Sequence, residues 1–196
     1  RVTVAINAED ARAKLKSIAF DLLVLDIMMP GKTGIEVCNI LRTQTQFQQT
    51  LIVFLTAMSD ENTEIKGLET GADDYITKPI SPKVLVSKVN ALFRRVTKEE
   101  TGTIQIGDLQ INREKYSVRF RDNDIILARK EFELLSLLAS KPGKVFLRNE
   151  ILNQIWGTDV IVGDRTIDVH IRKIRQKLGI DCITTVKGVG YKFEMQ

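Results

Sequence analysis

The first half of the chain contains short apolar runs that end in polar residues. One run, Leu22–Leu25, ends at Asp26 and is followed by a Pro-Gly turn signal, and a second, Leu51–Leu55, ends at Thr56. Apolar runs of this length, bounded by turn signals, are typical of strands that are covered on both faces of a parallel sheet. The pattern therefore predicts an α/β domain in which Leu22–Leu25 is a central strand.

The second half of the chain has a different pattern. Residues 104–120 alternate between apolar and polar positions and are broken by turn residues, which predicts a small antiparallel sheet. Apolar residues at helical spacing then predict three helices, over Phe132–Leu138, Arg148–Trp156 and Arg165–Leu178. A hairpin with glycines at its tip is predicted over Ile183–Phe193. The polar, aperiodic segment 96–102 separates the two patterns and is predicted to be a linker.

Three predicted strands end in side chains that suit phosphoryl chemistry. Asp26 and Thr56 end the first two, and the third, Asp74–Thr77, leads directly into Lys78-Pro79. The carboxyl ends of parallel strands meet at one edge of a sheet, which is where ligands bind. There, Asp26 would accept a phosphoryl group, Lys78 would neutralise its oxygens and Thr56 would hydrogen-bond to one of them. A cis Lys78-Pro79 bond would turn the lysine back towards Asp26.

These residues also fit plainer roles. Aspartate is common in turns, and threonine is common as a helix cap, so Asp26 and Thr56 have a purely structural alternative. Tyr75, inside the third strand, likewise fits ordinary half-buried packing.

The predicted helix Arg165–Leu178 has an apolar stripe for the core and a basic opposite face. On or near that face lie Arg165, Val169, Arg172, Lys173 and Gln176. From residue 165 to 196 there are seven Lys or Arg residues and three acidic ones, a local charge of +4 that equals the formal net charge of the whole chain. A concentrated basic surface on such a helix fits the major groove of DNA. The alternative is an ordinary solvated helix face.

Three motifs in the first half, LDIMMPGKTG, FLTA and GADDYITKP, stand in this order and at a characteristic spacing. On these motifs, residues 1 to about 95 resemble the receiver domain of two-component response regulators. The resemblance implies a flavodoxin-like α/β fold and phosphoryl transfer from a partner sensor histidine kinase to Asp26, assisted by Mg²⁺. It also implies that Thr56 and Tyr75 are switch residues, and that Asp26 and the backbone carbonyl of Met28 bind the metal.

The chain departs from this family at its start. Receivers begin with a strand that ends in a pair of acidic residues, whereas this sequence opens on Arg1–Ala5, which matches the family's second strand. We therefore expect an N-terminally truncated receiver that lacks the first strand and helix. Such a receiver would have a gap in its core. Because Mg²⁺ prefers about six oxygen ligands, it would also hold the ion poorly.

Three further motifs, RKEFELLSLL, RTIDVHIRKIRQKLG and TTVKGVGYKF, cover most of residues 103–196. They resemble the winged-helix output domain of the OmpR/PhoB family, an α+β winged helix-turn-helix. The resemblance implies that the helix from Arg165 reads promoter DNA in the major groove, that the hairpin enters the minor groove, and that residues 157–164 face RNA polymerase. The implied base contacts are Arg165, Val169 and Arg172, the implied phosphate contacts are Thr166, His170, Lys173 and Arg175, and the implied wing contact is Lys187.

Members of this family form homodimers on promoter repeats through charged residues of the receiver. The candidates in this chain are Lys66, Asp73, Asp74, Lys88 and Arg95. Glu64 and Val84 depart from the expected charges, which predicts the loss of one ion pair between the two copies.

Two alternative functions are considered: an enzyme, which particular residues disfavour, and an atypical regulator, which remains open. A haloacid-dehalogenase-like phosphatase also uses a strand-end aspartate, but it needs a second acid two residues later, where this chain has Met28. The only histidine, His170, has no nucleophile or metal ligand spaced to use it, so we do not expect an enzyme. An atypical regulator would bind DNA independently of phosphorylation, with the receiver as a dimerisation scaffold.

Composition agrees with a cytoplasmic regulator that has no membrane partner. The hydrophobic fraction of 43% is ordinary for a globular protein, and no apolar run approaches the roughly 18 residues of a membrane helix. Cys38 and Cys182 are isolated and are expected to be buried thiols in a reducing compartment. The predicted organisation is a receiver at 1–95, a linker at 96–102 and a winged-helix domain at 103–196.

Overall fold

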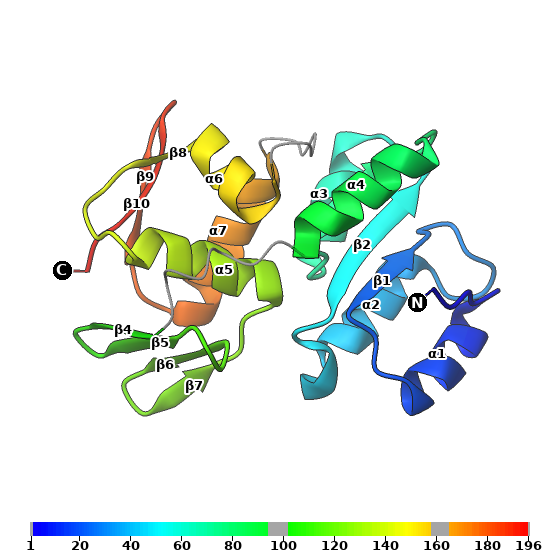
Figure 1. The fold of residues 1–196 in the computed structure, drawn as a ribbon, viewed down its shortest axis with the longest axis horizontal. Helices are drawn as coiled ribbons and strands as arrows, with labels where there is room; N and C mark the ends of the chain where they lie inside the picture. The colour runs from blue at the N-terminus through cyan, green and yellow to red at the C-terminus, as the bar shows by residue number, and fades with distance from the viewer. Residues whose placement is uncertain (1, 94–101, 158–164, 196) are drawn as a thin grey trace. The chain divides into compact units, whose positions relative to one another are not determined.

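The computed structural model of the 196-residue chain describes residues 2–93, 102–157 and 165–195 (Figure 1). The chain divides into two compact units, Arg1–Ile80 and Ser81–Gln196, and each is described by itself. Most of the predicted linker lies outside the described residues. The predicted bounds of 1–95, 96–102 and 103–196 therefore stay a prediction.

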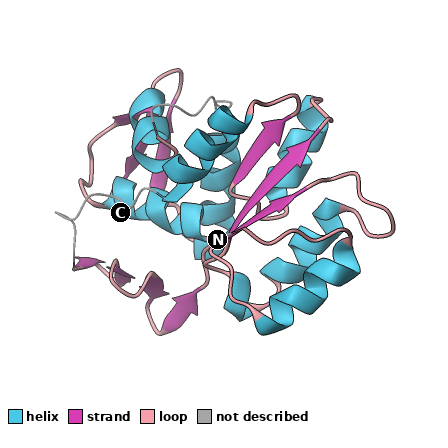
Figure 2. Ribbon diagram, turned by 45° about the vertical axis from the view of Figure 1, so that its right-hand side comes forward, coloured by secondary structure: helices cyan, strands magenta, loops and turns pink. Residues whose placement is uncertain are grey.

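Unit 1 is built on a parallel sheet of three strands, β1 (Leu22–Leu25), β2 (Leu51–Thr56) and β3 (Asp74–Thr77), in the order β1-β2-β3 (Figure 2). The central strand is β2, whose residues 51–54 are fully buried. Among the described residues β1 pairs only with β2, and its Val24 is 42% exposed. The prediction that Leu22–Leu25 is a central strand is therefore wrong. Its apolar side chains indicate a strand but not the number of its neighbours.

The described helices of unit 1 are α1 (Ala8–Ser17), α2 (Gly34–Arg42) and α3 (Glu61–Glu69), with a 3₁₀ turn, η1 (Thr45–Phe47), after α2. Each α-helix begins at a side-chain cap, because the first N–H groups of a helix have no partner within it. The caps are Asn7, Thr33 and Asp60, and Thr33 forms a reciprocal capping box with Glu36. The helices differ in burial, since α1 buries no residue while α2 and α3 each bury some.

The segment before α1 does not form the strand that was expected at Arg1–Ala5, since residues 2–5 are extended but lie in no sheet. Its backbone groups bond to α1 instead: the Ile6 N–H donates to Asp10 at 3.1 Å, and the Val4 carbonyl accepts from Lys14 at 2.8 Å. The side chains of Val4 and Ile6 are 73% and 84% exposed. A hollow of about 570 Å³ lies between α1 and α2, with an apolar lining of Leu15, Val37, Ile40, Leu41 and Phe47.

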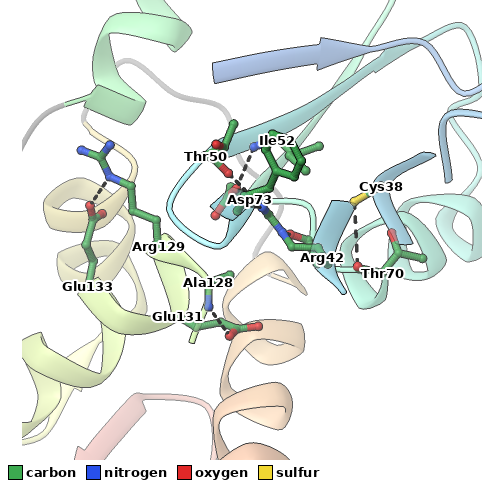
Figure 3. A network of polar contacts seen from close by, with 12 residues as sticks. Cys38, Arg42, Thr50, Ile52, Thr70, Asp73, Ala128, Arg129, Glu131 and Glu133 are labelled. Carbon is green, nitrogen blue, oxygen red and sulfur yellow. Dashed lines mark hydrogen bonds and ion pairs between the residues drawn. The ribbon is translucent and has the colours of Figure 1, made fainter. Parts of the chain in front are cut away.

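A buried ion pair joins several elements of unit 1 (Figure 3). Arg42 Nη2 lies 2.8 Å from Asp73 Oδ2, and the same oxygen accepts the Ile52 N–H at 2.8 Å. The guanidinium also donates to the carbonyls of Phe47, Thr50 and Gly71. Arg42 therefore holds α2, η1, β2 and the turn before β3 in one arrangement.

Unit 2 contains α4 (Pro82–Phe93) and an antiparallel sheet of β4 (Thr103–Ile106), β5 (Leu109–Asn112), β6 (Ser117–Phe120) and β7 (Asn123–Ile125). Its other helices are α5 (Arg129–Ala139), α6 (Arg148–Ile155) and α7 (Arg165–Leu178). The hairpin of β9 (Ile183–Val186) and β10 (Gly190–Phe193) pairs through β10 with the short strand β8 (Phe146–Leu147). The predicted sheet, helices and hairpin are confirmed. The pattern missed β7 and β8, because two or three residues are too few to show a period.

The helix α5 lies at the centre of unit 2, and every residue of it after Arg129 is buried. Its buried charges are paired, as a buried charge has to be. Lys130 Nζ donates to Glu133 at 2.7 Å and to the Ile155 carbonyl at 2.5 Å. Glu131 lies 2.6 Å from Lys177, which fixes α7 against α5. None of the described helices is both long and apolar enough to span a membrane.

Candidate functional site

The three residues predicted at the strand ends of unit 1 lie together. Lys78 Nζ is 2.6 Å from Asp26 Oδ2, and the other oxygen of that carboxylate accepts the Met28 N–H at 3.1 Å. Thr56 is fully buried at the end of β2; its hydroxyl accepts the Met58 N–H at 3.4 Å and lies close enough to Asp26 to lower the pKa of that carboxyl. The Lys78 N–H donates to the Thr56 carbonyl at 2.8 Å, and the Lys78-Pro79 bond is cis. An acid, a hydroxyl and an ammonium therefore share one rim, and the cap of the next helix is Asp60 rather than Thr56.

The surroundings of Asp26 keep its carboxyl group ionised. Partial burial alone would raise its pKa, but the Lys78 ammonium, the Met28 N–H and the Thr56 hydroxyl together hold the pKa below its usual value. The side chain is 33% exposed, so a reactant can reach it from solvent. An ionised and reachable carboxylate can act as a nucleophile.

Close backbone packing fixes the strand end that carries Asp26. A Cβ atom at Gly34, the first residue of α2, would lie 2.2 Å from the Asp26 carbonyl oxygen, and the Gly34 N–H donates to the Ile27 carbonyl at 3.0 Å. Only glycine lets α2 begin this close to the end of β1. Gly34 is the last residue of the motif LDIMMPGKTG, so the motif contains both the acid and the residue that makes room for it.

Tyr75 is buried beside the rim, and its hydroxyl donates to the Met58 carbonyl at 2.8 Å. Its ring meets Phe54 edge to face at 6.2 Å, and the absence of a side chain at Gly67 leaves room for both rings. Burial, followed by the charges of Asp60 and Glu64, raises the pKa of Tyr75 to about 12. The phenol is therefore a neutral donor at ordinary pH, and the switch role of Tyr75 stays a prediction.

The described residues at the rim supply few ligands for Mg²⁺. Asp26 provides one carboxylate, of which one oxygen is paired with Lys78, and the Met28 carbonyl is the other predicted ligand. No group of three or more His, Cys, Asp or Glu side chains suited to a metal occurs in the part of the chain that the structure describes. Because Mg²⁺ prefers about six oxygens, these residues alone do not make a complete site.

The exposed face of α7 differs from the prediction. Arg165 and Arg172 are exposed, as expected for residues that contact DNA, whereas the Lys173 side chain is only 14% exposed and lies 3.9 Å from Glu131. Thr166 and Val169, predicted to contact a phosphate and a base, are only 1% and 7% exposed. The buried stripe of α7 is therefore wider than the spacing of its isoleucines indicates, and we correct the expectation that Thr166 and Val169 lie on the surface.

Two further predicted phosphate contacts are engaged inside unit 2. His170 is 2% exposed; its Nδ1 lies 2.8 Å from the Thr166 carbonyl, and its ring packs edge to face on Trp156. Arg175 is half-buried, and its Nη2 donates to the Ile183 carbonyl at 2.6 Å, so this side chain joins α7 to β9. By contrast, Lys187 is exposed in the turn between β9 and β10, where a wing contact requires it.

Sequence reasoning missed three side chains that meet between the exposed face of α7 and the hairpin. Asp168 lies on the exposed face of α7 and contacts Arg148 of α6 and Tyr191 of β10. The partners are 20 and 23 residues away from Asp168 in the sequence. The RTIDVHIRKIRQKLG motif contained Asp168, but no local pattern pointed to its partners.

The predicted dimer residues are mostly not on the surface. Asp73 and Asp74 are fully buried, Asp73 pairs with Arg42, and Asp74 accepts the Tyr75 N–H at 2.8 Å. Lys88 is 7% exposed, whereas Lys66 is exposed on α3. We therefore correct the expectation that Asp73, Asp74 and Lys88 present their charges to a second copy. Arg95 and the predicted polymerase-facing residues 158–164 lie outside the described residues.

Two protein-family models match the chain. The model described as "Response regulator receiver domain" matches residues 1–90, and the model described as "Transcriptional regulatory protein, C terminal" matches residues 122–193. The two matches follow the same order as the two units of the structure.

Known proteins align along most of the chain. The "Phosphate regulon transcriptional regulatory protein PhoB" of Rhizobium meliloti (strain 1021) is 39% identical over 98% of this chain and 87% of its own length. Among solved structures, DrrB, described as a Thermotoga maritima OmpR/PhoB homolog, is 34% identical over 100% of this chain and 88% of that chain, with a TM-score of 0.49. A cysteine mutant of RitR is 25% identical over 100% of this chain and 88% of that chain, with a TM-score of 0.76. The two family models and the identity to PhoB show that this chain belongs to the OmpR/PhoB family of two-component response regulators, in which a flavodoxin-like receiver precedes a winged-helix DNA-binding domain.

Proposed function

We propose that a sensor histidine kinase phosphorylates Asp26 and thereby controls a promoter-binding surface on α7 and the hairpin. In the first step, an ionised oxygen of Asp26 attacks the phosphorus of the kinase's phosphohistidine. An O–P bond forms, the P–N bond breaks, and its electron pair stays on the imidazole nitrogen of the kinase. The product is an acyl phosphate on Asp26, and no small molecule is turned over.

The residues around Asp26 have separate tasks in this step. The Lys78 ammonium, now paired with Asp26 at 2.6 Å, would neutralise the incoming phosphoryl oxygens, and the Thr56 hydroxyl would donate to one of them. The approach of Lys78 to Asp26 is the observation that supports the proposal most strongly. Thr56 and Tyr75, which neighbour the rim, would pass the change to the surface of the receiver.

Receiver domains as a family bind Mg²⁺ for phosphorylation. In this chain we propose Asp26 and the Met28 carbonyl as its protein ligands, but the described residues fall short of a complete site. The bond changes described for Asp26 do not require the ion, so labelling is measured both with and without Mg²⁺.

For the second step, we propose that α7 enters the major groove of promoter DNA and that Lys187 contacts the adjacent minor groove. The exposed Arg165 and Arg172 are the candidates for base edges, since arginine pairs with guanine through two hydrogen bonds. Lys173, at the edge of the same face, is the candidate for a phosphate. Binding would weaken steeply as salt rises, because phosphate contacts release counterions.

Two further partners follow from the family and stay proposals. Two copies would bind neighbouring promoter repeats as a homodimer, with Lys66 as the exposed candidate of the predicted pairing set. Residues 157–164 would face RNA polymerase. Relatives named as transcriptional regulators of the phosphate regulon suggest control of transcription in the cytoplasm.

The test is chemical labelling of the full chain with acetyl phosphate, with and without Mg²⁺. We expect an acid-stable, hydroxylamine-sensitive phosphate on the wild type and none on Asp26→Asn. The matched control is Asp21→Asn, which removes the same charge from an exposed residue just before β1 and should label normally. Label that survives in Asp26→Asn would exclude Asp26 as the phosphoacceptor.

The second candidate function is the atypical regulator, which binds DNA independently of phosphorylation. The observation in its favour is the incomplete Mg²⁺ ligand set among the described residues. It predicts no labelling under any condition, with equal promoter affinity for the wild type and Asp26→Asn.

A further inference from the structure

Three side chains from separate elements of unit 2 form a cluster that we name the wing clasp: Arg148, Asp168 and Tyr191. Arg148 is the first residue of α6, Asp168 lies in the first turn of α7, and Tyr191 lies on β10. Arg148 Nη2 is 2.5 Å from Asp168 Oδ1 and 3.2 Å from the Tyr191 hydroxyl. The Tyr191 hydroxyl donates to the same oxygen of Asp168. One carboxylate oxygen therefore joins the helix that reads DNA to both neighbouring elements.

Backbone and ring contacts of Arg148 also hold the wing clasp against the hairpin. The Arg148 N–H donates to the Val189 carbonyl at 3.3 Å, next to the tip of the hairpin. The guanidinium lies over the Tyr191 ring at 5.3 Å from its centre. Burial and then the hydrogen bond to Asp168 raise the pKa of Tyr191 to about 12, so the phenol keeps the proton that it donates.

The position of Asp168 is unexpected for a surface that meets a polyanion. Its side chain is 45% exposed, and it lies between Arg165 and Arg172 along the exposed face of α7. A carboxylate there repels phosphate wherever the surface approaches DNA without a fitting sequence. Arg148 offsets part of that charge through the ion pair at 2.5 Å.

We propose that Asp168 is a specificity-determining positioning residue of the DNA-binding surface. Through Arg148 and Tyr191 it sets the angle between α7 and the hairpin, so that both reach their grooves on a matching sequence. Its own charge lowers affinity for sequences that do not match. The inference rests on the proposed DNA binding and adds a residue that acts through others rather than by touching a base.

The proposal predicts a different signature for each member of the clasp. Asp168→Asn removes the repulsion and loosens the joint, so affinity for non-matching DNA rises while affinity for matching DNA falls. We expect the ratio of the two affinities to drop by at least about tenfold, the scale of one charge-assisted hydrogen bond. Tyr191→Phe keeps the charge and the ring but loses the hydroxyl, so only matching DNA is bound less well. Arg148→Met leaves the Asp168 charge without its guanidinium and weakens binding to both kinds of DNA.

The experiment measures binding of the full chain to two duplexes by fluorescence anisotropy over a range of KCl concentrations. One duplex is selected by the wild-type chain from a random pool, and the other is its scrambled sequence. The matched control is Asp181→Asn, which makes the same change in charge at an exposed residue before β9, outside the clasp. Asp181→Asn should leave the affinity ratio unchanged. Melting of each variant, followed by fluorescence of Trp156, verifies that unit 2 is folded.

The outcomes separate this inference from the proposed function. A fall in the ratio for Asp168→Asn but not for Asp181→Asn supports the clasp. Equal losses on both duplexes, or equal ratios for the two variants, would overturn it while DNA binding stands. If Asp168→Asn does not fold, Tyr191→Phe decides in the same way, through a reduced or an unchanged ratio. Failure of the wild type to enrich any sequence would overturn the proposed DNA reading and the clasp with it.

Discussion

The two units support their functional side chains in different ways. In unit 1, Asp26 follows an edge strand, and the helix α1 of the same unit buries no residue. In unit 2, α7 packs on a helix whose residues after Arg129 are all buried, and ion pairs tie the two helices together. A surface made of one helix depends on the packing behind it. A phosphoacceptor depends instead on three adjacent strand ends, which the register of the sheet sets even where the edge is open.

Breaking a buried ion pair should lower the stability of one unit more than any other change proposed below. Arg42→Met removes the guanidinium from Asp73, and losing one partner of a buried pair costs about 3–5 kcal/mol. Lys130→Met should cost less, because Glu133 keeps the Arg129 guanidinium at 3.1 Å. Urea unfolding followed by circular dichroism reports both units, while fluorescence of the only tryptophan, Trp156, reports unit 2. We expect Arg42→Met to shift the first signal and not the second.

The control for this prediction is Arg12→Met, because Arg12 belongs to α1, which buries no residue. It should change the unfolding midpoint by no more than an ordinary surface substitution, within about 0.5 kcal/mol. A shift in the Trp156 transition of Arg42→Met as large as the shift in circular dichroism would contradict independent support of the two units.

The next largest loss of stability is expected from alanine substitution of two glycines, one in each unit. A Cβ atom at Gly34 would lie 2.2 Å from the Asp26 carbonyl oxygen, and one at Gly190 would lie 1.9 Å from the Phe146 carbonyl oxygen. Each alanine substitution should cost about 1–3 kcal/mol through overpacking. Gly34→Ala should lose labelling by acetyl phosphate and keep the DNA affinity of the unphosphorylated chain, and Gly190→Ala should do the reverse. Impairment of both labelling and this unphosphorylated DNA affinity by either variant would show that the two units do not fold on independent support.

Two valines that pair across β1 and β2 differ in exposure. Val24 on β1 is 42% exposed, whereas Val53, its partner on β2, is fully buried. Val53→Thr buries a hydroxyl and should cost about 1–3 kcal/mol, while Val24→Thr should cost less than about 0.5 kcal/mol. Urea midpoints by circular dichroism measure both. Equal losses of stability for the two variants would mean that the exposed face of β1 at Val24 is covered in solution.

The rim was predictable from sequence, because its cause is local. Parallel strands bring their carboxyl ends to one edge of the sheet whatever the strand order. Asp26, Thr56 and Lys78 could therefore be placed together without knowing which strands are neighbours. The order itself was not predictable. In the described ranges, β1 pairs with β2 alone, and residues 2–5 lie in no sheet; the Val4 carbonyl and the Ile6 N–H bond to side chains of α1 instead, which the hydrophobic pattern does not show.

The surface of α7 that we propose for DNA binding was only partly predictable, because the burial of its residues is set by elements distant in the sequence. The isoleucine spacing located the helix and its basic face. It did not show that Trp156 of α6 covers His170, or that the buried stripe extends to Thr166 and Val169. The partners of Asp168 lie at least 20 residues away, so the clasp could be found only in three dimensions.

The smallest effect tests whether the charges of the rim also contribute to folding. The pKa of Asp26 in the folded chain lies below its usual value of 3.8. As the pH falls, the unfolded chain therefore takes up this proton first. The stabilisation by the Lys78 pair is present above about pH 3.8 and is lost as the pH falls through the lower folded pKa. Because both side chains are about a third exposed or more, screening keeps the contribution small.

Urea midpoints of the wild type, Asp26→Asn and Asp21→Asn, measured at intervals between about pH 6 and about pH 3, give the comparison. We expect the wild type and Asp21→Asn to lose stability along parallel curves, and Asp26→Asn to decline less steeply at the acid end. The Trp156 transition should be the same in all three, because the rim belongs to unit 1. An equally steep decline in Asp26→Asn would mean that the Lys78 pair positions the phosphoacceptor without stabilising the fold.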